Sequence, residues 1–327
     1  MIAPTAHAQD RTWLDIPPGP QPAVPARHLA LPRADQALAY ACSWWAVMLP
    51  AWLQRHQLAP QAAGHYTAGF EASSALRERY DDLFDLRPDG QARPYPVLQA
   101  HCVATLLQAR VLVDLGVNRR HLTLLRHHTR LPLGACTFAA TRQQTLDCRL
   151  QRLVRVSPTE VLALLQTRIA SADGDTVASV DDVFVVQGLS PSEALRAEED
   201  DDLRRAYSRS RRREPMIDPA SGLVRRRQLF IGGDAGRRFA RVSGDRRRLP
   251  LPRLNWRPSG RRPVVQDLYL RNLVVRELAE WGIDQDSLQI TFTARARLGQ
   301  TLSLLVEGDA FELVGEDDAL VAFGQAA

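Results

Sequence analysis

The sequence predicts an α+β fold in which a helical half packs on an antiparallel sheet and a small α+β unit follows. Three observations support this fold class. Residues 41–57 are apolar nearly all round at helical spacing, which indicates a buried helix. The run VDDVFVVQGL at 180–189 has the apolar, β-rich composition of a central strand. From residue 263 onward, one amphipathic helix precedes several short apolar strands.

The composition is that of a globular protein with a basic surface. The 327 residues are 45% hydrophobic and 24% charged, and the net charge is +5. All 42 basic residues are arginine. The four cysteines form no CxxC pair, so we predict neither a zinc site nor a disulfide framework, and no metal or cofactor. These cysteines are Cys42, Cys102, Cys136 and Cys148.

The ends and hydrophobic runs of the chain bear on its location. No stretch has the ~18–20 consecutive apolar residues that a membrane-spanning helix needs. The first ten residues, MIAPTAHAQD, have neither the basic segment nor the apolar segment of a signal peptide. We therefore expect a cytoplasmic protein, or one exported by a route without an evident Sec signal.

Changes in composition suggest three parts. Residues 1–28 are rich in proline and are expected to form an extended arm. Residues 29–262 are expected to form the main domain, with a charged insertion near 191–216 where a block of acids precedes a block of arginines. Residues 263–327 are expected to form a small α+β C-terminal domain.

Helices are predicted from apolar spacing and end signals. After 41–57, the segment SSALRERYDDLFDL begins with Ser73 or Ser74 as a possible cap. Another helix runs from 96 to 115 and stops at Gly116, and a further one is expected at 118–128. The segment 157–173 has Ser157 as cap and Glu160 completing a capping box. The last helix ends at Gly282.

Strands are predicted from short apolar or β-branched runs. Residues 232–262 are rich in Gly, Arg and Pro and are expected to form loops. The expected strands lie at 27–32, 134–142, 148–156, 180–189, 229–231, 288–298, 301–308, 310–315 and 319–324.

Cys42 is the strongest candidate for a nucleophile. It stands in the first turn of the expected helix, where unpaired N–H groups and the helix dipole favour the reactive thiolate. Gln36, six positions upstream, could donate a hydrogen bond to a developing oxyanion. The alternative is that Cys42 is an ordinary buried cysteine of an apolar helix.

The stretch QALAYACSWWAVM resembles the Gln…Cys-Trp-Ala helix of papain-like cysteine peptidases, in particular their compact bacterial branch. The order of the later segments DVFVVQG and IDPASGLVRRRQLF also resembles this family. The resemblance implies a papain-like fold over about residues 28–232, with Cys42 as nucleophile, Gln36 as oxyanion donor and Asp218 as the residue that orients the base. It also implies a polypeptide substrate or protein partner in a cleft between the two halves.

Asp182 stands where this family carries its histidine base. A carboxylate opposes formation of a thiolate and is a weak acid catalyst near neutral pH. The base could instead come from His121, His127 or His128, or the domain could be a pseudopeptidase that binds without cutting. His127 and His128, beside Arg126 and Arg130, could also belong to a solvated basic face.

An Arg-rich region suggests a second class of function. Residues 204–262 contain 19 arginines, which on one face would bind nucleic acid or an acidic partner without catalysis. The region has few aromatic residues for stacking on bases, and the acids at 198–202 could neutralise part of it. A solvated surface is the alternative.

Overall fold

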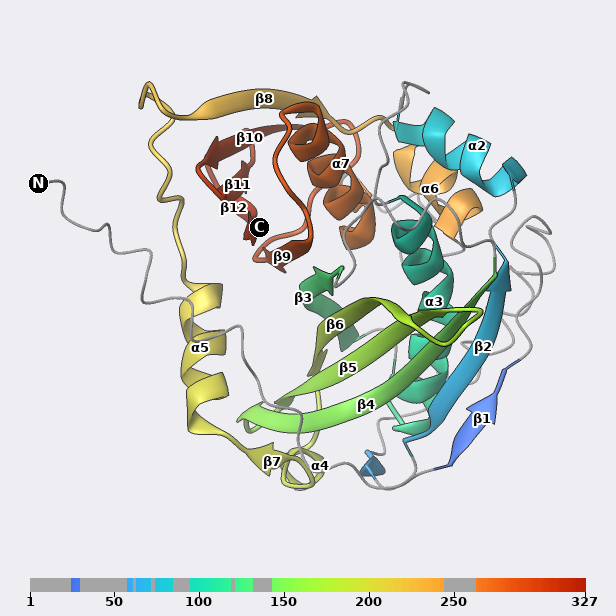
Figure 1. Cartoon of the computed structure of the whole chain (residues 1–327). Helices are drawn as coiled ribbons and strands as arrows, with labels where there is room; N and C mark the ends of the chain where they lie inside the picture. Colours follow the sequence, from blue (N-terminus) through green and yellow to red (C-terminus); the bar gives the residue numbers. More distant parts are fainter. Residues whose placement is uncertain are drawn as a thin grey trace, which may run out of the picture.

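The computed structural model contains one twelve-stranded, mostly antiparallel sheet and, among the described residues, six helices (Figure 1). The structure describes residues 25–29, 58–60, 63–71, 74–84, 95–118, 121–131, 143–243 and 263–327. Cys42, Gln36 and the helix expected at 41–57 lie outside these residues, as does the strand expected at 134–142.

Eleven strands follow one another across the sheet, and β7 (Glu198–Glu199) pairs with β4 beside this path. All neighbours pair antiparallel except β1 with β2 and β4 with β7. In spatial order the eleven are β1 (Ala26–His28), β2 (His65–Glu71), β4 (Gln143–Ser157), β5 (Glu160–Ser171), β6 (Thr176–Gln187), β3 (Leu122–Arg130), β9 (Ser287–Phe292), β12 (Leu320–Ala326), β11 (Ala310–Val314), β10 (Thr301–Glu307) and β8 (Arg225–Phe230).

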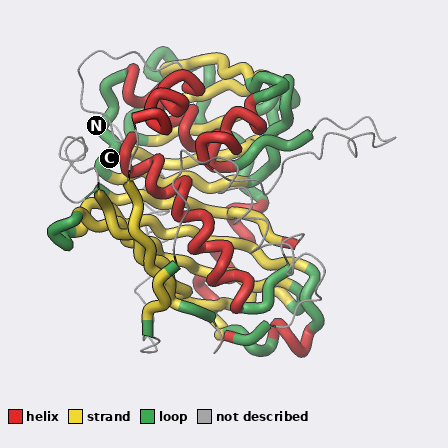
Figure 2. Tube along the Cα trace, turned by 90° about the vertical axis from the view of Figure 1, so that its right-hand side faces the viewer, coloured by secondary structure: helices red, strands yellow, loops and turns green. Residues whose placement is uncertain are grey.

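Two long helices lie against this sheet (Figures 1 and 2). α3 packs on β2, β4, β5 and β6, whereas α7 lies beside β9–β12. The pairing of β3 with β9 joins these two helix-and-strand units into one sheet. The helices are α2 (Ser74–Phe84), α3 (Tyr95–Asp114), α4 (Pro191–Ala194), α5 (Asp201–Arg211), α6 (Ala235–Ser243) and α7 (Asp267–Glu280).

The predictions of α2, α3 and α7 are confirmed. α3 and α7 end where glycine follows: Gly116 has φ of 81° and Gly282 has φ of 69°, a left-handed conformation that costs glycine little. The predicted strands β4, β6 and β9–β12 are also confirmed, because their short apolar runs end at recognisable turns. None of the helices in the described part of the chain has the length and apolar composition that a membrane span needs.

Three predictions of local structure are wrong. Residues 160–171 form β5 instead of a helix, because Ser157 pairs with Glu160 across a two-residue hairpin turn. The Ser-Pro-Thr-Glu sequence thus makes a tight turn instead of a capping box. The helix expected at 118–128 is largely β3, whose side chains alternate between the two faces of the sheet. The loop region 232–262 includes α6.

The predicted architecture, a papain-like helical half packed on a separate sheet, is also wrong. One sheet connects the described strands, and β5 and most of β3 lie where helices were expected. Sheet pairing on both sides of β5 stabilises an extended conformation that the Leu- and Ala-rich sequence does not itself favour.

The charged segment near 191–216 is ordered. Asp200 caps α5 by accepting a hydrogen bond from the Leu203 backbone N–H at 2.9 Å. Leu203 and Tyr207 of α5 pack on apolar side chains of β4, β5 and β6. These contacts lie on the face of the sheet opposite to α3, so α5 covers a second, smaller core.

We expect that replacing Gly324 with alanine lowers the free energy of unfolding by about 1–3 kcal/mol or more. A Cβ atom at this position would overlap the Gln289 carbonyl oxygen and lie 2.5 Å from Phe311 Cζ. Gly69→Ala is the matched control, because nothing lies within 4 Å of a Cβ there and the change should stay within about 0.5 kcal/mol. Urea unfolding followed by circular dichroism measures both, and equal effects would contradict the overlap.

Candidate functional site

A buried His–Asp pair lies in the centre of the sheet. His127 on β3 and Asp182 on β6 stand directly opposite each other in the antiparallel register. His127 Nδ1 is 2.7 Å from Asp182 Oδ1, and the two residues are 0% and 1% exposed. A charge this deeply buried is stabilised only if it is hydrogen-bonded and paired. The surrounding groups therefore decide what the pair can do.

Helix α3 and strand β5 supply further polar partners. Gln108 of α3 donates from Nε2 to Asp182 Oδ2 at 2.5 Å and lies 3.4 Å from Thr167 Oγ1. Both oxygens of the Asp182 carboxylate thus accept hydrogen bonds from the interior. Gln108 and Thr167 are themselves buried. The carboxylate is held in one orientation from the side of α3.

Helix α7 supplies a cation. Arg271 is fully buried, and its Nη1 is 2.9 Å from His127 Nε2, while its Nε donates to Asn272 Oδ1. A guanidinium can only donate, so Nε2 of His127 accepts, and the His127 proton is on Nδ1, facing Asp182. The Thr129 hydroxyl, 2.7 Å from the same Nε2, is a second donor. This arrangement holds His127 neutral, with the Nε2 lone pair directed at donors.

These contacts define the acid–base network, which consists of Gln108, His127, Thr129, Asp182 and Arg271. It joins the two units of the fold, because Gln108 comes from α3, Arg271 from α7, and the others from the sheet between them. Chemically it offers a proton acceptor, a carboxylate that orients it, and a positive group that could stabilise negative charge on an oxygen.

The neighbouring residues on both strands face the other side of the sheet. His128 pairs in register with Asp181, and its Nε2 is 3.0 Å from Ser287 Oγ. Burial lowers the pKa of His128 to about 4, and Arg130 and Arg126 add to this shift. Burial likewise raises the pKa of Asp181. Burial also lowers the pKa of Arg126, to about 10.

Cys148 is a free cysteine, and it is unsuited to be a nucleophile. It lies on β4, opposite Thr167, and is completely buried. Burial raises the pKa of its thiol to about 12, so almost no thiolate exists near neutral pH.

The structure separates the predicted site residues that it describes. Asp182 is buried in β6, whereas Asp218 is exposed in a turn, where it accepts a hydrogen bond from the Ala220 backbone N–H. The adjacent Ile217 N–H donates to Glu312 of β11, and three strands separate β11 from β6. Cys42 and Gln36 lie outside the described residues, so their roles stay predictions.

Some members of the network had a signal in the sequence. Asp182 was singled out because it stands where the papain-like family carries its histidine base, and His127 was one of three histidines considered as a base. Gln108, Thr129 and Arg271 were missed. For Arg271 the available signal was an arginine within the apolar helical run LYLRNLVV, because a charge in such a position is rarely buried without a partner.

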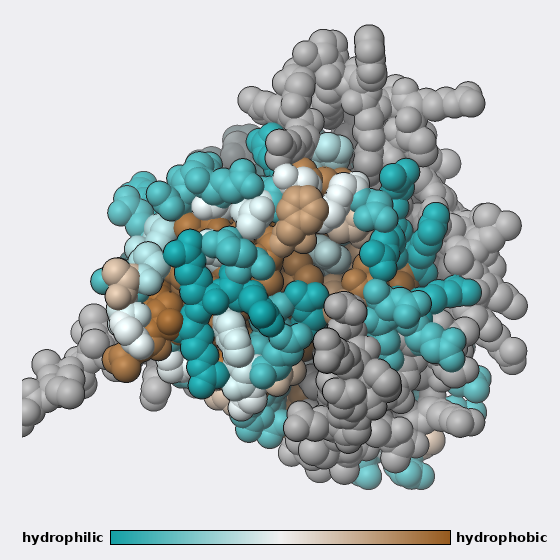
Figure 3. Space-filling view, turned by 90° about the horizontal axis from the view of Figure 1, so that it is seen from above, coloured by the Kyte–Doolittle hydropathy of each residue, from teal (hydrophilic) through white to brown (hydrophobic). Residues whose placement is uncertain are grey.

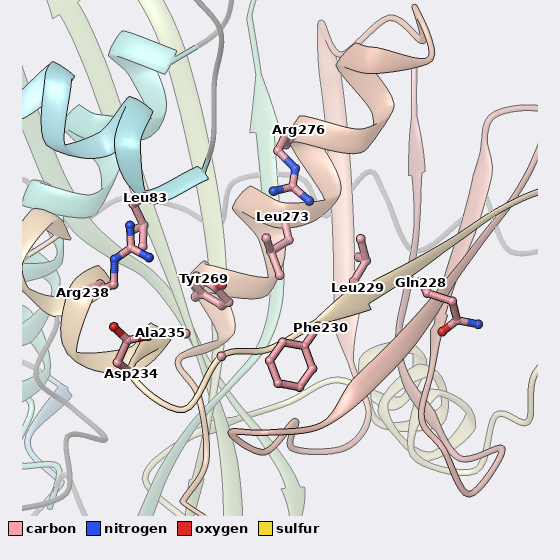
Figure 4. A pocket seen from close by; sticks show the side chains of 11 residues that line it. Leu83, Gln228, Leu229, Phe230, Asp234, Ala235, Arg238, Tyr269, Leu273 and Arg276 are labelled. Atoms are coloured by element: carbon pink, nitrogen blue, oxygen red, sulfur yellow. The ribbon is translucent and has the colours of Figure 1, made fainter.

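A separate recess lies where α2, α6, α7 and β8 meet. It has a volume of about 270 Å³, and Tyr269 and Leu273 of α7 form its apolar wall (Figure 4). Figure 3 shows apolar surface near the centre of this side of the molecule, with hydrophilic side chains on both sides of it. At 100° per residue, Tyr269 and Leu273 occupy the opposite face of α7 from Arg271. The recess is therefore not the mouth of the acid–base network.

Metal binding by the described residues has no support. The part of the chain that the structure describes holds no group of three or more His, Cys, Asp or Glu side chains that could bind a metal ion. Two close His–carboxylate contacts at the sheet, His65 with Asp147 at 2.8 Å and His127 with Asp182 at 2.7 Å, each join one histidine to one carboxylate.

Comparison with solved structures identifies the fold. HtdX of Mycobacterium tuberculosis is 14% identical, with a TM-score of 0.55, over 80% of this chain and 98% of its own. A MaoC-like dehydratase of Phytophthora capsici is 14% identical, with a TM-score of 0.53, over 81% and 94%. The full-length peroxisomal multifunctional enzyme type 2 of Drosophila melanogaster is 12% identical, with a TM-score of 0.56, over 80% of this chain and 48% of that one.

These likenesses show the hotdog fold, in which an antiparallel sheet wraps around a long helix. No protein-family model matches the sequence, and no curated protein is significantly similar to it. The resemblance to papain-like peptidases is therefore wrong, and with it the prediction of a cysteine peptidase or pseudopeptidase. The short stretch around Cys42 is similar to the papain-like motif, but the order of the strands across the sheet is that of a different fold.

The alternative prediction, an Arg-rich protein that binds nucleic acid or an acidic partner, is contradicted by the same structural neighbours. The described arginines of 204–262 are spread over α5, β8 and α6, which lie on different sides of the molecule (Figure 1). Several are paired within the chain, as in Arg204 with Asp201 and Arg227 with Glu277, both at 2.7 Å. Dispersed and paired arginines do not make a common phosphate-binding face.

Proposed function

We propose that the protein is a hydratase–dehydratase, which adds water to or removes it from a β-hydroxy carbonyl compound, with His127 as the group that transfers the proton. The observation that carries this proposal is the buried His127–Asp182 pair, with Arg271 2.9 Å from His127 Nε2. The shared fold of MaoC-like dehydratases supports it, because enzymes of that name already perform a dehydration on this architecture.

The chemistry needs a base at one carbon and an acid at the next. In the dehydration direction, the C–H bond next to the carbonyl breaks and its proton goes to His127 Nε2. The electron pair forms the C=C bond while the C–OH bond breaks. The same proton then passes from His127 to the leaving hydroxyl, which departs as water, so atoms and charge balance. A positioned imidazole contributes ~10²–10⁴-fold to such steps.

The other members of the network have supporting roles in this proposal. Asp182 holds the proton on Nδ1 and stabilises the imidazolium that forms, and Gln108 fixes the carboxylate. Arg271 is positioned to donate to the carbonyl oxygen as negative charge develops there. For this to happen, the substrate oxygen takes the place of His127 Nε2 as its acceptor. Exclusion of water from the buried site strengthens each of these interactions.

The test is hydration of crotonyl-N-acetylcysteamine, a small α,β-unsaturated thioester, followed by the loss of enoyl absorbance. We expect His127→Gln to lower the rate by ~10²–10⁴-fold. His128→Gln is the matched control: it changes the neighbouring buried histidine on the opposite face of the sheet, and we expect it to retain the wild-type rate. Melting temperatures of both variants separate loss of chemistry from loss of folding.

The outcomes are clear. Absence of hydration by the wild-type protein with thioesters of short and medium chain length would overturn the proposal. So would an equal loss of rate in both histidine variants, since that result would indicate a structural effect on the sheet. If Asp182→Asn retains the wild-type hydration rate while His127→Gln is inactive, His127 acts without the help of the carboxylate.

A further inference from the structure

The recess between α2, α6, α7 and β8 contains a hydroxyl group that a bound molecule can reach. Tyr269 of α7 lines the recess and is 6% exposed (Figure 4). Its ring packs against Phe84 and Phe239, with centroids 5.5 and 5.8 Å away. Its hydroxyl makes no hydrogen bond with a residue that the structure describes, and the oxygen is not enclosed by protein atoms. A partner for this group would come from the recess.

The Tyr269 hydroxyl is a hydrogen-bond donor at neutral pH. Burial raises the pKa of Tyr269 above its ordinary value, while Arg276 and Arg238 lower it and Asp234 raises it by smaller amounts. The hydroxyl therefore keeps its proton and can donate it in a hydrogen bond. A molecule that satisfies this group must present an acceptor in the recess.

Two guanidinium groups lie on two sides of Tyr269 (Figure 4). Arg238 Nη2 donates to the Asp82 carbonyl at 3.1 Å, and Arg276 Nη1 donates to the Phe84 carbonyl at 3.2 Å. Both carbonyls belong to the last turn of α2, where carbonyls lack partners within the helix. A guanidinium carries more N–H groups than these bonds use. Both cations are therefore held at the recess with donors left for a ligand.

The charges beside Tyr269 favour an acceptor with a single negative charge. Arg276 also donates from Nε to Glu277 Oε1 at 2.9 Å, whereas Arg238 forms no ion pair with a carboxylate of the described residues. Hydrogen bonds to a carboxylate are stronger than those to a neutral acceptor. Asp234 also lines the recess, and a doubly charged phosphate would be repelled by it more than a carboxylate would.

The size of the recess limits the rest of the ligand. Its volume is about 270 Å³, and a cavity of ~150 Å³ is enough to hold benzene. There is room for one ring with a short acidic side chain. Leu229 and Leu273 are buried in the walls, while Phe230 at the recess is 66% exposed. A ring bound here would cover Phe230 and remove apolar surface from water.

We propose that this recess binds a small monocarboxylate with a compact apolar body of about one aromatic ring. The carboxylate accepts hydrogen bonds from the Tyr269 hydroxyl and the Arg238 guanidinium, and the ring packs against Phe230 and Leu273. The site lies on the opposite face of α7 from Arg271, so it is distinct from the acid–base network and does not depend on the proposed reaction.

The experiment compares two probes of nearly equal shape by fluorine NMR titration. Para-fluorophenylacetate carries the carboxylate, and para-fluorophenylacetamide has a neutral amide in its place. We expect the acid to bind at least about tenfold more tightly than the amide, as one charge-assisted hydrogen bond predicts. Added sodium chloride should reduce this difference, because salt screens the attraction to the exposed Arg238.

Two pairs of variants locate the probe in the recess. Tyr269→Phe removes only the hydroxyl and should lower the affinity for the acid about tenfold. Tyr207→Phe is its matched control, because Tyr207 is also 6% exposed but lies on α5, outside the recess lining. Arg238→Met should lower the affinity about tenfold, whereas Arg237→Met, the next arginine of α6, should leave it unchanged.

Asp234→Asn gives a change of opposite sign. Loss of the carboxylate at the recess should raise the affinity for the acid about threefold. An unchanged or lowered affinity in this variant would mean that the acid does not bind beside Asp234, and would overturn the site.

Melting temperatures and circular dichroism establish that each variant is folded. Absence of binding by the acid, or equal affinity of the wild-type protein for acid and amide, would overturn the proposal. So would an unchanged affinity in folded Tyr269→Phe, or an equal loss in the two tyrosine variants. Displacement of the acid by inorganic phosphate at equal concentration would overturn the preference for a carboxylate. Hydration activity has no part in these measurements, so failure of the proposed reaction leaves this test intact.

Discussion

Replacing Arg271 with methionine should lower the free energy of unfolding by about 3–5 kcal/mol. Arg271 is fully buried and donates to His127 Nε2 and Asn272 Oδ1. Methionine keeps most of the apolar length of the side chain and removes the charge and the donors. The Asp182 carboxylate then stays in the interior without the cation that lies on the other side of His127. Chemical denaturation followed by circular dichroism measures the loss.

The control for this change is Arg237→Met on α6. Arg237 is exposed, so its replacement should change stability by less than about 0.5 kcal/mol. A comparable loss in the two variants would mean that Arg271 contributes only what a surface arginine does.

A double-mutant cycle shows whether Arg271 and Asp182 act together through His127. Asp182→Asn alone removes the carboxylate that lies on the other side of His127 from the Arg271 cation. This change should also lower the free energy of unfolding. If the two charges are coupled, the double variant should lose less free energy of unfolding than the two single variants lose together, by at least about 0.5–1 kcal/mol. Simple additivity would indicate that His127 isolates the two charges, and the network would then not be a unit.

The sequence predicts local elements better than it predicts their partners. α3 and α7 were found because helical spacing and the glycines at 116 and 282 are signals within one segment. β5 was missed because the turn at 158–159 has the residues of a helix start, and only pairing with β4 and β6 makes it a strand. The order of strands across the sheet has no comparable local signal.

The same limit applies to the candidate site. His127 and Asp182 are 55 positions apart in sequence, and they meet only because of the β3–β6 register. Arg271 reaches them from α7, a further 144 positions from His127. Each residue alone is an ordinary polar group in an apolar run. The peptidase resemblance rested on a short motif, and a short motif does not specify which strands lie side by side.

Stability should fall as the pH decreases from about 7 to about 4, in part because of His128. Burial lowers the pKa of His128 from its ordinary 6.5 to about 4, with Arg130 and Arg126 on the same strand adding to the shift. The folded protein therefore holds His128 neutral, whereas the unfolded chain takes up a proton below pH 6.5. The stabilisation is fully present above pH 6.5, is lost as the pH falls toward 4, and amounts to about 3 kcal/mol.

His128→Gln isolates this contribution, because Asp181 opposite His128 has a raised pKa and acts with the opposite sign. A carboxyl whose pKa is raised by folding gains stability as the pH falls through that range, so the wild-type curve alone would combine the two effects. Urea unfolding at about pH 7 and about pH 4 should show a smaller loss in the variant than in the wild type, by about 3 kcal/mol. Equal losses of the free energy of unfolding in the variant and the wild type would mean that His128 takes up its proton as readily in the folded protein as in the unfolded chain. In that case β3 is more open to water between Arg126 and Arg130 than its burial indicates.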